Sequence, residues 1–269
     1  MSLGARLMLK PGHKAKLQHR NPNATPGTKS KKAAEVALAR NMARLEELQY
    51  LLYAENKHAV LVVFQAMDAG GKDGTIRHVM SSLNPQGTAV TPFKVPTTEE
   101  AEHDFLWRIH KVTPRAGEFA IFNRSHYEDV LVVRVHSLVP KAVWSKRYDQ
   151  INNFEKLLAE DHVKILKFFL LISKDEQKKR IEQRLSDPTR QWKLSEADFA
   201  ERAYWDEYTR AYEEALTRCS TPWAPWYVIP ANRKWFRNLA VSQILVESLE
   251  ELKMKFPQST LDLSKIKLE

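Results

Sequence analysis

The chain has 269 residues and a formal net charge of +9, because 42 lysines and arginines outweigh 33 acidic residues. The length suits one large α/β domain or two small ones, and the charge favours a polyanionic partner: nucleic acid, an acidic membrane or a polyphosphate-like substrate. The single cysteine excludes an intrachain disulfide. Without a signal-like N-terminus or an apolar run near the roughly 20 residues of a membrane span, we expect a cytoplasmic protein with no membrane partner.

The chain alternates between apolar runs and segments of helical spacing. Residues 1–30 are rich in proline, glycine and polar residues, so we expect an irregular N-terminal arm with little core-forming power. Strands are expected over 60–66, 88–93, 118–123, 163–172 and 226–230. Helices are expected over 31–57, 73–83, 97–110, 140–160, 173–185, 195–218 and 233–254, with a loop and helix over 124–136.

This alternation predicts an α/β fold of three layers, in which helices flank a five-stranded parallel sheet. No change in composition marks a second domain. We therefore expect one domain over 31–257, with a helical lid inserted at about 178–200 and a polar tail over 258–269. Ligands of such sheets bind at the carboxyl ends of the strands.

A glycine-rich turn after the first strand is the main motif. The run 60–64 leads into this turn and then into a helix, which is the order of a phosphate-binding P-loop. Against the pattern G-x-x-x-x-G-K-[ST], the chain has Ala66 at the first glycine, Gly71 and Lys72 as the Gly-Lys pair, and Asp73 in place of Ser or Thr. Backbone amides there would close around phosphate oxygens, and Lys72 would reach the terminal phosphates. An ordinary β-turn-α connection is the alternative.

Two carboxylates in this turn conflict with a simple anion site. Asp68 and Asp73 would repel a phosphate unless a divalent cation lay between them and the ligand. The sequence therefore predicts a metal-assisted P-loop kinase-like site.

The third strand ends in a second polar cluster. Asn123 stands where a Walker B strand usually carries Asp, so it can orient a metal-bound water but brings no charge; Glu128 or Asp129 could supply one. Arg124 can bind a phosphate in a bidentate way. The alternative is that Arg124 and Asp129 are only an ion pair at a helix end. His126 is interpreted as a packing residue, because phosphoryl transfer needs positioning and charge neutralisation more than a base.

Basic residues surround the same predicted edge. Arg180 and Arg184 share one helical face, and Arg190 and Lys193 follow a proline break, as in a mobile lid that closes on phosphates. A solvated charged helix is the alternative. Further cations are expected beside the sheet edge at Arg77, His78, Lys94, Lys234 and Arg237. The aromatic residues Trp205, Tyr208 and Tyr212 have helical spacing and are interpreted as core rather than as a base-stacking platform.

Taken together, these motifs resemble the polyphosphate kinase 2 family over roughly 11–257. The resemblance rests on four stretches, namely Asp68-Ala-Gly-Gly-Lys72-Asp73-Gly, Asn123-Arg-Ser-His-Tyr-Glu-Asp129, the lid 184–193, and Pro225-Trp-Tyr-Val-Ile-Pro230 with Arg233-Lys-Trp. It implies a thymidylate-kinase-like fold and phosphoryl transfer between inorganic polyphosphate and a nucleotide, with Mg²⁺ or Mn²⁺. Asn123 departs from the Asp that many members have. The Glu128-Asp129 pair is similar to the subgroup that phosphorylates both AMP and ADP.

The expected roles follow from the motifs and this resemblance. Catalytic roles are expected for Asp68, Lys72, Asp73, Arg124, Glu128 and Asp129. Nucleotide or phosphate binding is expected for Ala69, Gly70, Gly71, Gly74, Asn123, Tyr127 and Arg184. Polyphosphate binding is expected for Arg77, His78, Lys94, Arg190, Lys193, Lys234 and Arg237, and metal binding for Asp68, Asp73 and Asn123.

The expected partners are inorganic polyphosphate and AMP, ADP or ATP, with guanine nucleotides left open, in a homo-oligomer. Two alternatives remain at this point. An ATP-dependent nucleoside or nucleotide kinase would use the same scaffold with another donor. A nucleic-acid-binding protein would use the positive charge, but it gives no reason for Asp68 and Asp73 in a glycine-rich loop, so nucleic acid is not the expected partner.

Overall fold

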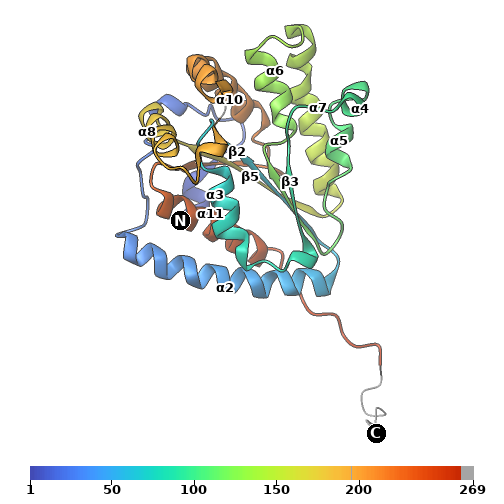
Figure 1. The fold of residues 1–269 in the computed structure, drawn as a ribbon. Coiled ribbons are helices and arrows are strands. Elements are labelled where there is room, and N and C mark those ends of the chain that lie inside the picture. Colours follow the sequence, from blue (N-terminus) through green and yellow to red (C-terminus); the bar gives the residue numbers. More distant parts are fainter. Residues whose placement is uncertain (195, 262–269) are drawn as a thin grey trace.

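Six strands form one mixed sheet in the order β1-β6-β5-β2-β4-β3 (Figure 1). The computed structural model describes residues 1–194 and 196–261. The strands are β1 (Met8–Leu9), β2 (Ala59–Gln65), β3 (Thr88–Pro92), β4 (Phe119–Asn123), β5 (Val163–Leu171) and β6 (Trp226–Pro230). The neighbours from β6 to β3 pair in parallel, whereas β1 pairs antiparallel to β6. The five expected strands pair in parallel, but the sheet is six-stranded and mixed rather than five-stranded and parallel, because the two-residue strand β1, which leaves no periodic signal in the sequence, adds to one edge.

Eleven α-helices and six 3₁₀ turns connect these strands in the described part of the chain. The helices are α1 (Leu3–Leu7), α2 (Lys31–Glu55), α3 (Lys72–Val79), α4 (Thr98–Glu102), α5 (Trp107–His110), α6 (Val132–Val135), α7 (Lys141–Glu160), α8 (Lys174–Leu185), α9 (Glu196–Ala200), α10 (Trp205–Cys219) and α11 (Lys234–Glu250). The 3₁₀ turns are η1 (Leu17–His19), η2 (Met80–Ser82), η3 (Pro85–Gly87), η4 (His126–Val130), η5 (Gln191–Lys193) and η6 (Glu201–Tyr204).

Two expected helices are divided in the structure. The expected helix over 97–110 is α4 and α5, although the Thr97–Glu100 capping box is present as the sequence predicts. The expected helix over 195–218 is α9, η6 and α10, and its expected first residue lies outside the described residues. Of the polar tail expected over 258–269, residues 262–269 also lie outside them.

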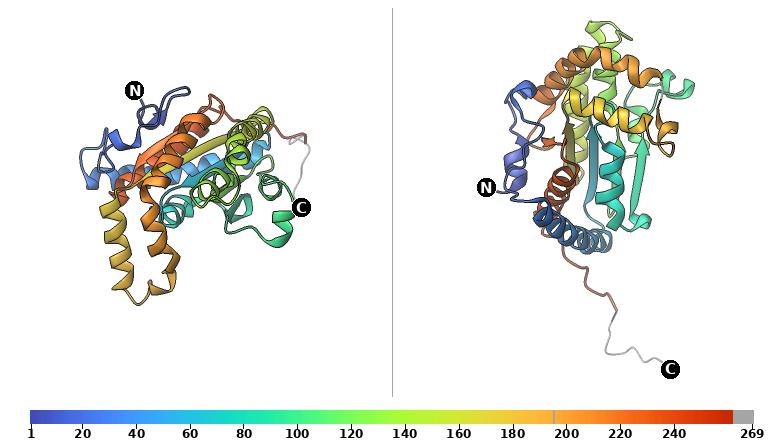
Figure 2. Two further views of the ribbon diagram at one scale, coloured as in Figure 1. Left: turned by 90° about the horizontal axis from the view of Figure 1, so that it is seen from above. Right: turned by 60° about the vertical axis from the view of Figure 1, so that its left-hand side comes forward.

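Helices cover both faces of the sheet, which gives the three layers that the alternation predicts (Figures 1 and 2). One apolar cluster lies between the sheet and α2, α3 and α11, and the other lies between the sheet and α7 and α10. Every residue of β2 is buried, which explains why its sequence is a continuous apolar run. No helix in the described part of the chain is long and apolar enough to cross a membrane.

The N-terminal segment belongs to the domain. Leu7, Leu9 and Leu17 are buried in the two apolar clusters. The backbone N–H of Ala15 donates to Thr217 Oγ1 at 3.1 Å, and that of Leu17 donates to a carboxylate oxygen of α10 at 2.5 Å. The expectation of an irregular arm with little core-forming power is thus wrong for this segment, because isolated leucines among prolines find their partners only in the folded sheet.

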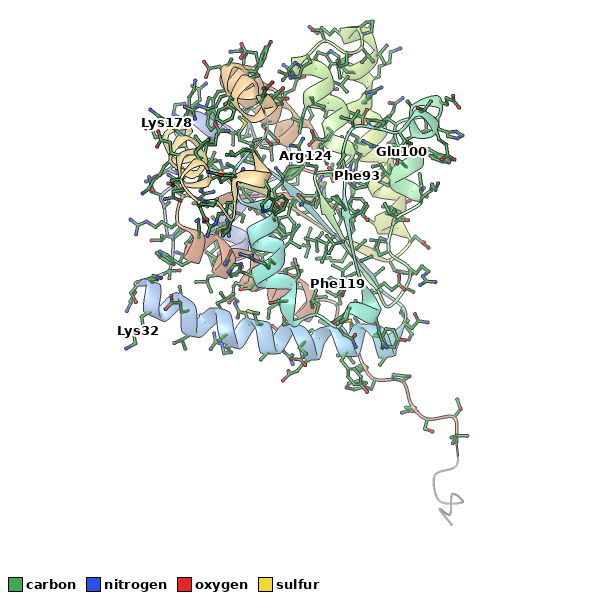
Figure 3. All side chains as sticks on the ribbon, viewed as in Figure 1. Lys32, Phe93, Glu100, Phe119, Arg124 and Lys178 are labelled. Carbon is green, nitrogen blue, oxygen red and sulfur yellow. The ribbon has the colours of Figure 1, made fainter. Side chains whose placement is uncertain are left out.

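The carboxyl ends of the parallel strands meet at one edge, as the fold class predicts. Phe64 pairs with Asn123 in the register of β2 and β4, so the loops that follow these strands are neighbours. Figure 3 shows Arg124 at this edge and Phe119 toward the opposite end of the same strand. From this edge α8 and the start of α10 project together from the body (Figure 2, left), at the position expected for the lid.

Candidate active site

The loop between β2 and α3 has the backbone geometry of a phosphate-binding turn. Gly71, the N-cap of α3, has φ +103°, a backbone conformation that residues other than glycine rarely adopt. At Gly70 a Cβ would lie 2.7 Å from the carbonyl oxygen of Met67, so only glycine fits. The amides of this loop and of the first turn of α3 can therefore surround an anion at a helix N-terminus.

Lys72 lies beneath this loop. Its side chain is buried, and Nζ donates to the carbonyl oxygen of Ala66 at 3.2 Å. Burial lowers the pKa of Lys72, as does the nearby Arg124, whereas the carboxylates of Asp68, Glu128 and Asp73 oppose this shift. The three carboxylates therefore lie within electrostatic reach of the ammonium group.

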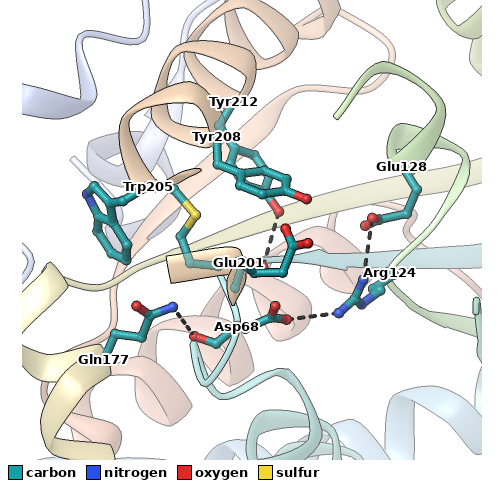
Figure 4. Close-up of a pocket in the computed structure, with 10 residues that line it drawn as sticks. Asp68, Arg124, Glu128, Gln177, Glu201, Trp205, Tyr208 and Tyr212 are labelled. Carbon is teal, nitrogen blue, oxygen red and sulfur yellow. Dashed lines mark hydrogen bonds and ion pairs between the residues drawn. The ribbon is translucent and has the colours of Figure 1, made fainter. Parts of the chain in front are cut away.

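Arg124 joins the end of β4 to the P-loop. Nη2 donates to Asp68 Oδ1 at 2.8 Å, and Nη1 lies 3.5 Å from Glu128 Oε2 (Figure 4). Burial alone would lower the pKa of Arg124, but the carboxylates of Glu128 and Asp68 outweigh burial and raise it. The structure thus brings these three predicted residues together, and Arg124 is not the helix-end partner of Asp129 that the alternative required.

Two predicted residues of the same segment face elsewhere. Asp129 Oδ1 accepts from Arg147 Nη1 at 2.9 Å, and burial raises the pKa of Asp129 to about 6. Tyr127 is fully buried and donates to Glu155 Oε1 at 2.9 Å. The expectation that Tyr127 contacts a nucleotide is contradicted by this burial, and Asp129 is held by Arg147 rather than directed at Arg124. In such a tight turn the sequence does not show which side chains face the core.

Asp73 and Asn123 contact each other across the P-loop. Asn123 Nδ2 donates to Asp73 Oδ1 at 2.9 Å. The described residues contain no group of three or more His, Cys, Asp or Glu side chains that could hold a metal ion alone. Mg²⁺ usually keeps several waters and binds through one or two carboxylates together with substrate phosphates. The oxygens of Asp68 and Asp73 fit such an open arrangement, whereas a closed protein cage does not exist in this part of the chain.

Two buried arginines support the P-loop from the other side. Arg180 Nη1 donates to the carbonyl oxygens of Ala69 and Gly70, each at 3.0 Å. Arg237 lies against Gly71, and burial together with Arg180 lowers the pKa of Arg237 to about 10. Arg237 is only 3% exposed, so it acts beneath the loop and does not offer the surface contact expected from the sequence.

Other predicted cations extend this positive group. Partial burial lowers the pKa of Lys234, and the nearby Arg180, Arg237 and Arg190 lower it further. Arg190 is exposed and forms an ion pair with Asp187 at 2.8 Å. The side chain of Lys193 lies outside the described residues.

The remaining predicted cations lie farther along the edge. Arg77 and His78 are exposed on α3, where the His78 ring is hydrogen-bonded to the carbonyl oxygen of Gly74 at 2.8 Å. Lys94 is exposed after β3, and Arg184 is half-buried in the last turn of α8, close enough to lower the pKa of Arg180. The exposed side chains among these are available to a long anion.

The pocket beside Asp68 and Arg124 is lined in part by α8, η6 and α10. Tyr212 belongs to the apolar core and Trp205 and Tyr208 pack against it, as their spacing predicts, but all three also line the pocket. Figure 4 shows that the lining includes Gln177 of α8, Glu201 of η6, and Trp205, Tyr208 and Tyr212 of α10. Gln177 Nε2 donates to the carbonyl oxygen of Asp68 at 3.0 Å, and Tyr212 Oη donates to that of Ala66 at 3.1 Å. The i, i+3, i+7 spacing of the three aromatic residues was the available signal, since it places them on one face of a helix that follows the lid.

A P-loop after a central strand, a charged cluster after the neighbouring strand and basic residues on the projecting helix α8 define a P-loop phosphotransferase of the kinase class. The family model for polyphosphate kinase 2 matches residues 28–257, and the chain belongs to this family. The resemblance carried by the four sequence stretches is thereby confirmed. Membership in a kinase family implies a divalent metal ion at the phosphates.

Known proteins match nearly the whole chain. It is 54% identical to the AMP/ADP-polyphosphate phosphotransferase of Meiothermus ruber, over 97% of this chain and 98% of that protein. It is 47% identical to the ADP-polyphosphate phosphotransferase of Rhodopseudomonas palustris, over 93% of this chain and 90% of that protein. The crystal structure of polyphosphate kinase 2 from Arthrobacter aurescens TC1 superimposes with a TM-score of 0.94 at 45% identity, covering 98% of this chain and 94% of that one.

Proposed function

We propose that this protein is a polyphosphate-dependent nucleotide kinase that moves a phosphoryl group between inorganic polyphosphate and AMP or ADP, in either direction. The observation that carries the proposal is the division of charge around the P-loop. One group beside the P-loop is cationic, with Arg180, Arg190, Lys234 and Arg237, and a second group pairs Arg124 with the carboxylates of Asp68 and Glu128. The relatives named for AMP, ADP and polyphosphate support the same substrates.

The cationic side suits a long polyanion. Arg180 and Arg237 are buried and support the loop, whereas Arg190 and Lys234 are exposed beside them. A polyphosphate chain on these cations would be held by charge along its length and by loop amides at its reacting end. Its continuation would run past the remaining proposed cations, which are Arg77, His78, Lys94, Arg184 and Lys193.

We place the nucleotide at the pocket between Arg124 and α10, whose cavity of about 30 Å³ has to open to admit a base. Its aromatic side chains offer apolar surface to a base, and Arg124 offers a fork of donors to the acceptor phosphate. Glu128 shares Arg124 with Asp68, so these carboxylates set the direction of the guanidinium. The two phosphate groups would then meet above Lys72 for a direct in-line transfer without a covalent enzyme intermediate.

Asp68, Asp73 and Asn123 would hold Mg²⁺ or Mn²⁺ at this meeting point. Bound there, the metal neutralises charge on the phosphates and aligns them. Lys72 contributes a fixed positive charge from a buried position, which requires little reorganisation during transfer. Asn123 orients Asp73 through its hydrogen bond, which gives a role to the amide at a position where a carboxylate is usual.

The donor decides between this function and an ATP-dependent kinase. The purified protein, incubated with ADP, polyphosphate and a divalent metal but without ATP, is expected to form ATP. AMP, GMP and GDP in parallel reactions would define the acceptor, and omission of polyphosphate is the control. Absence of ATP from ADP, together with phosphorylation of AMP when ATP is supplied, would reject polyphosphate as the donor.

A further inference from the structure

A fully buried charged cluster lies behind the active site. Lys167 of β5 and Glu155 of α7 are both 0% exposed, and Lys167 Nζ lies 2.5 Å from Glu155 Oε2. Lys167 also donates to Tyr127 Oη at 2.8 Å and to the carbonyl oxygen of Cys219 at 2.7 Å. Two apolar residues of similar volume often stabilise a core as well as such a pair, so its presence calls for a reason other than stability.

The cluster contacts the segment that carries the pocket residues Arg124 and Glu128. Glu155 Oε1 accepts from Tyr127 Oη at 2.9 Å and lies 3.3 Å from His126 Nε2. Burial lowers the pKa of His126, and because a carboxylate can only accept, the ring donates its Nε2–H to Glu155. His126 and Tyr127 lie between Arg124 and Glu128 in the sequence, and the latter two line the pocket. His126 and Tyr127 therefore hold this segment on its buried side, and Arg124 and Glu128 lie on the side of the pocket.

The backbone of this segment needs such support. Arg124 has φ +63°, an uncommon conformation for a residue other than glycine, which persists where the surroundings enforce it. Its N–H donates to the carbonyl oxygen of Phe64 at 3.1 Å, and the hydroxyl of Ser125 accepts from Gln65 Nε2 and from the N–H of Tyr127, each at 3.1 Å. Beyond these local bonds, η4 is held by Arg147, which donates to Asp129, and by the partners of His126 and Tyr127.

We infer that the Lys167–Glu155 pair is a positioning device that fixes η4 through Tyr127 and His126, so that Arg124 and Glu128 keep their places in the pocket. The inference rests on the proposed function for the reaction that these two residues serve. Directional hydrogen bonds fix the rotation of a side chain, which apolar packing of the same volume does not. A displacement of 1 Å at reacting groups can lower a rate by about 10²-fold, so loss of the pair should appear mainly in kcat.

The double variant Lys167→Met/Glu155→Leu tests this role, because it removes both charges and leaves apolar side chains in the core. We expect it to fold with a lower Tm, because Tyr127 Oη and the carbonyl oxygen of Cys219 lose these partners. Its kcat with ADP and polyphosphate should fall at least ~10-fold while each KM changes less than ~3-fold. Amide hydrogen exchange over 125–131 should become at least ~10-fold faster, a readout that does not depend on any substrate.

The matched control is Asn41→Leu/Ser242→Ala. Asn41 Nδ2 donates to Ser242 Oγ at 3.1 Å, and both residues are buried between α2 and α11, on the other face of the sheet. This variant should leave kcat and exchange over 125–131 unchanged. Should Lys167→Met/Glu155→Leu not fold, Tyr127→Phe removes only the shared hydroxyl and should still lower kcat by about 3–10-fold.

The inference would be overturned if, in either variant of the cluster, both kcat and amide hydrogen exchange over 125–131 stay within ~2-fold of the parent. If the parent forms no ATP from ADP and polyphosphate, the proposed function fails instead. In that case the exchange measurement alone decides whether the pair fixes the segment.

Discussion

Arg124 and Lys72 are the two cations on which the carboxylates of the site converge. Replacement of either by alanine removes a preorganised charge from the position where phosphoryl transfer develops negative charge. We expect Arg124→Ala and Lys72→Ala each to lower kcat with ADP and polyphosphate by at least ~10²-fold. Arg115→Ala is the control, since the Arg115 side chain is 86% exposed and pairs with Glu118 on the surface. Near-normal turnover of either site variant would contradict its assignment.

Glu128 offers a test of acceptor choice. Its carboxylate shares Arg124 with Asp68 and lines the pocket, so a neutral side chain would change how the acceptor phosphate is held. We expect Glu128→Asn to lower kcat/KM for AMP more than for ADP, by at least ~5-fold in their ratio. Paired assays with the two nucleotides at fixed polyphosphate measure this ratio, and an unchanged ratio would reject the subgroup with both activities.

Asp129, in the same segment, should make the stability of the fold depend on pH. Because burial raises the pKa of Asp129 from 3.8 to about 6, the folded state binds this proton more tightly than the unfolded state does. Its contribution to stability is therefore complete below about pH 4 and is lost as the pH rises through about 6. Asn cannot ionise, so the free energy of unfolding of Asp129→Asn, relative to the parent, should rise by about 1–3 kcal/mol between these pH values. Urea titrations at several pH values measure the difference, and a flat difference would contradict the raised pKa.

Among the elements, the N-terminal segment differs most from its sequence. Leu9 of β1 is 2% exposed and belongs to the cluster beneath α7 and α10. Leu9→Ala should lower the free energy of unfolding by about 2–5 kcal/mol, since it leaves a cavity in the core. Val36→Ala on α2, at a position that is 68% exposed, should change it by no more than about 0.5 kcal/mol. Equal, small effects in thermal or urea unfolding would mean that the segment is not part of the stable fold.

The segment expected to form a lid holds arginines in two different environments, which its sequence does not distinguish. Arg180 and Arg184 share a helical face, yet Arg180 is buried on the carbonyls of the P-loop and Arg184 is only half-buried. The start of α8 is therefore fixed to the loop, and the cations available to a ligand come from its end and from beyond it. Helical spacing predicts a shared direction but not how near each residue lies to the sheet.

At the scale of the whole molecule, the positive charges behind the net charge of +9 are unevenly distributed. The exposed cations Arg190 and Lys234 lie on one side of the P-loop, so salt should weaken a long anion more than a nucleotide in a pocket. We expect the KM for polyphosphate to rise at least ~3-fold between about 50 and 200 mM NaCl, and that for ADP to rise less. Steady-state assays at constant free metal measure both constants. Equal changes would indicate that general screening, rather than this surface, controls binding.

Much of the architecture follows from the sequence alone. Continuous apolar runs predict the buried parallel strands, and glycines before Lys72 predict the P-loop, because both are local consequences of burial and backbone geometry. The four family stretches predict the class of protein for the same reason, since the functional residues of each stretch are close neighbours in the sequence. The short strand β1 lacked such a signal, because two residues define no period.

Only the tertiary structure decides which side of a segment each residue faces. It directs Arg124 and Glu128 to the pocket, and Tyr127 and Asp129 to Glu155 and Arg147. It also brings Trp205, Tyr208 and Tyr212 to the P-loop and places Lys167 behind it, although these residues are far from the motif in the sequence. The physical reason is that burial and hydrogen bonding across elements depend on long-range packing, whereas sequence spacing reports only the neighbours within a strand or a helix.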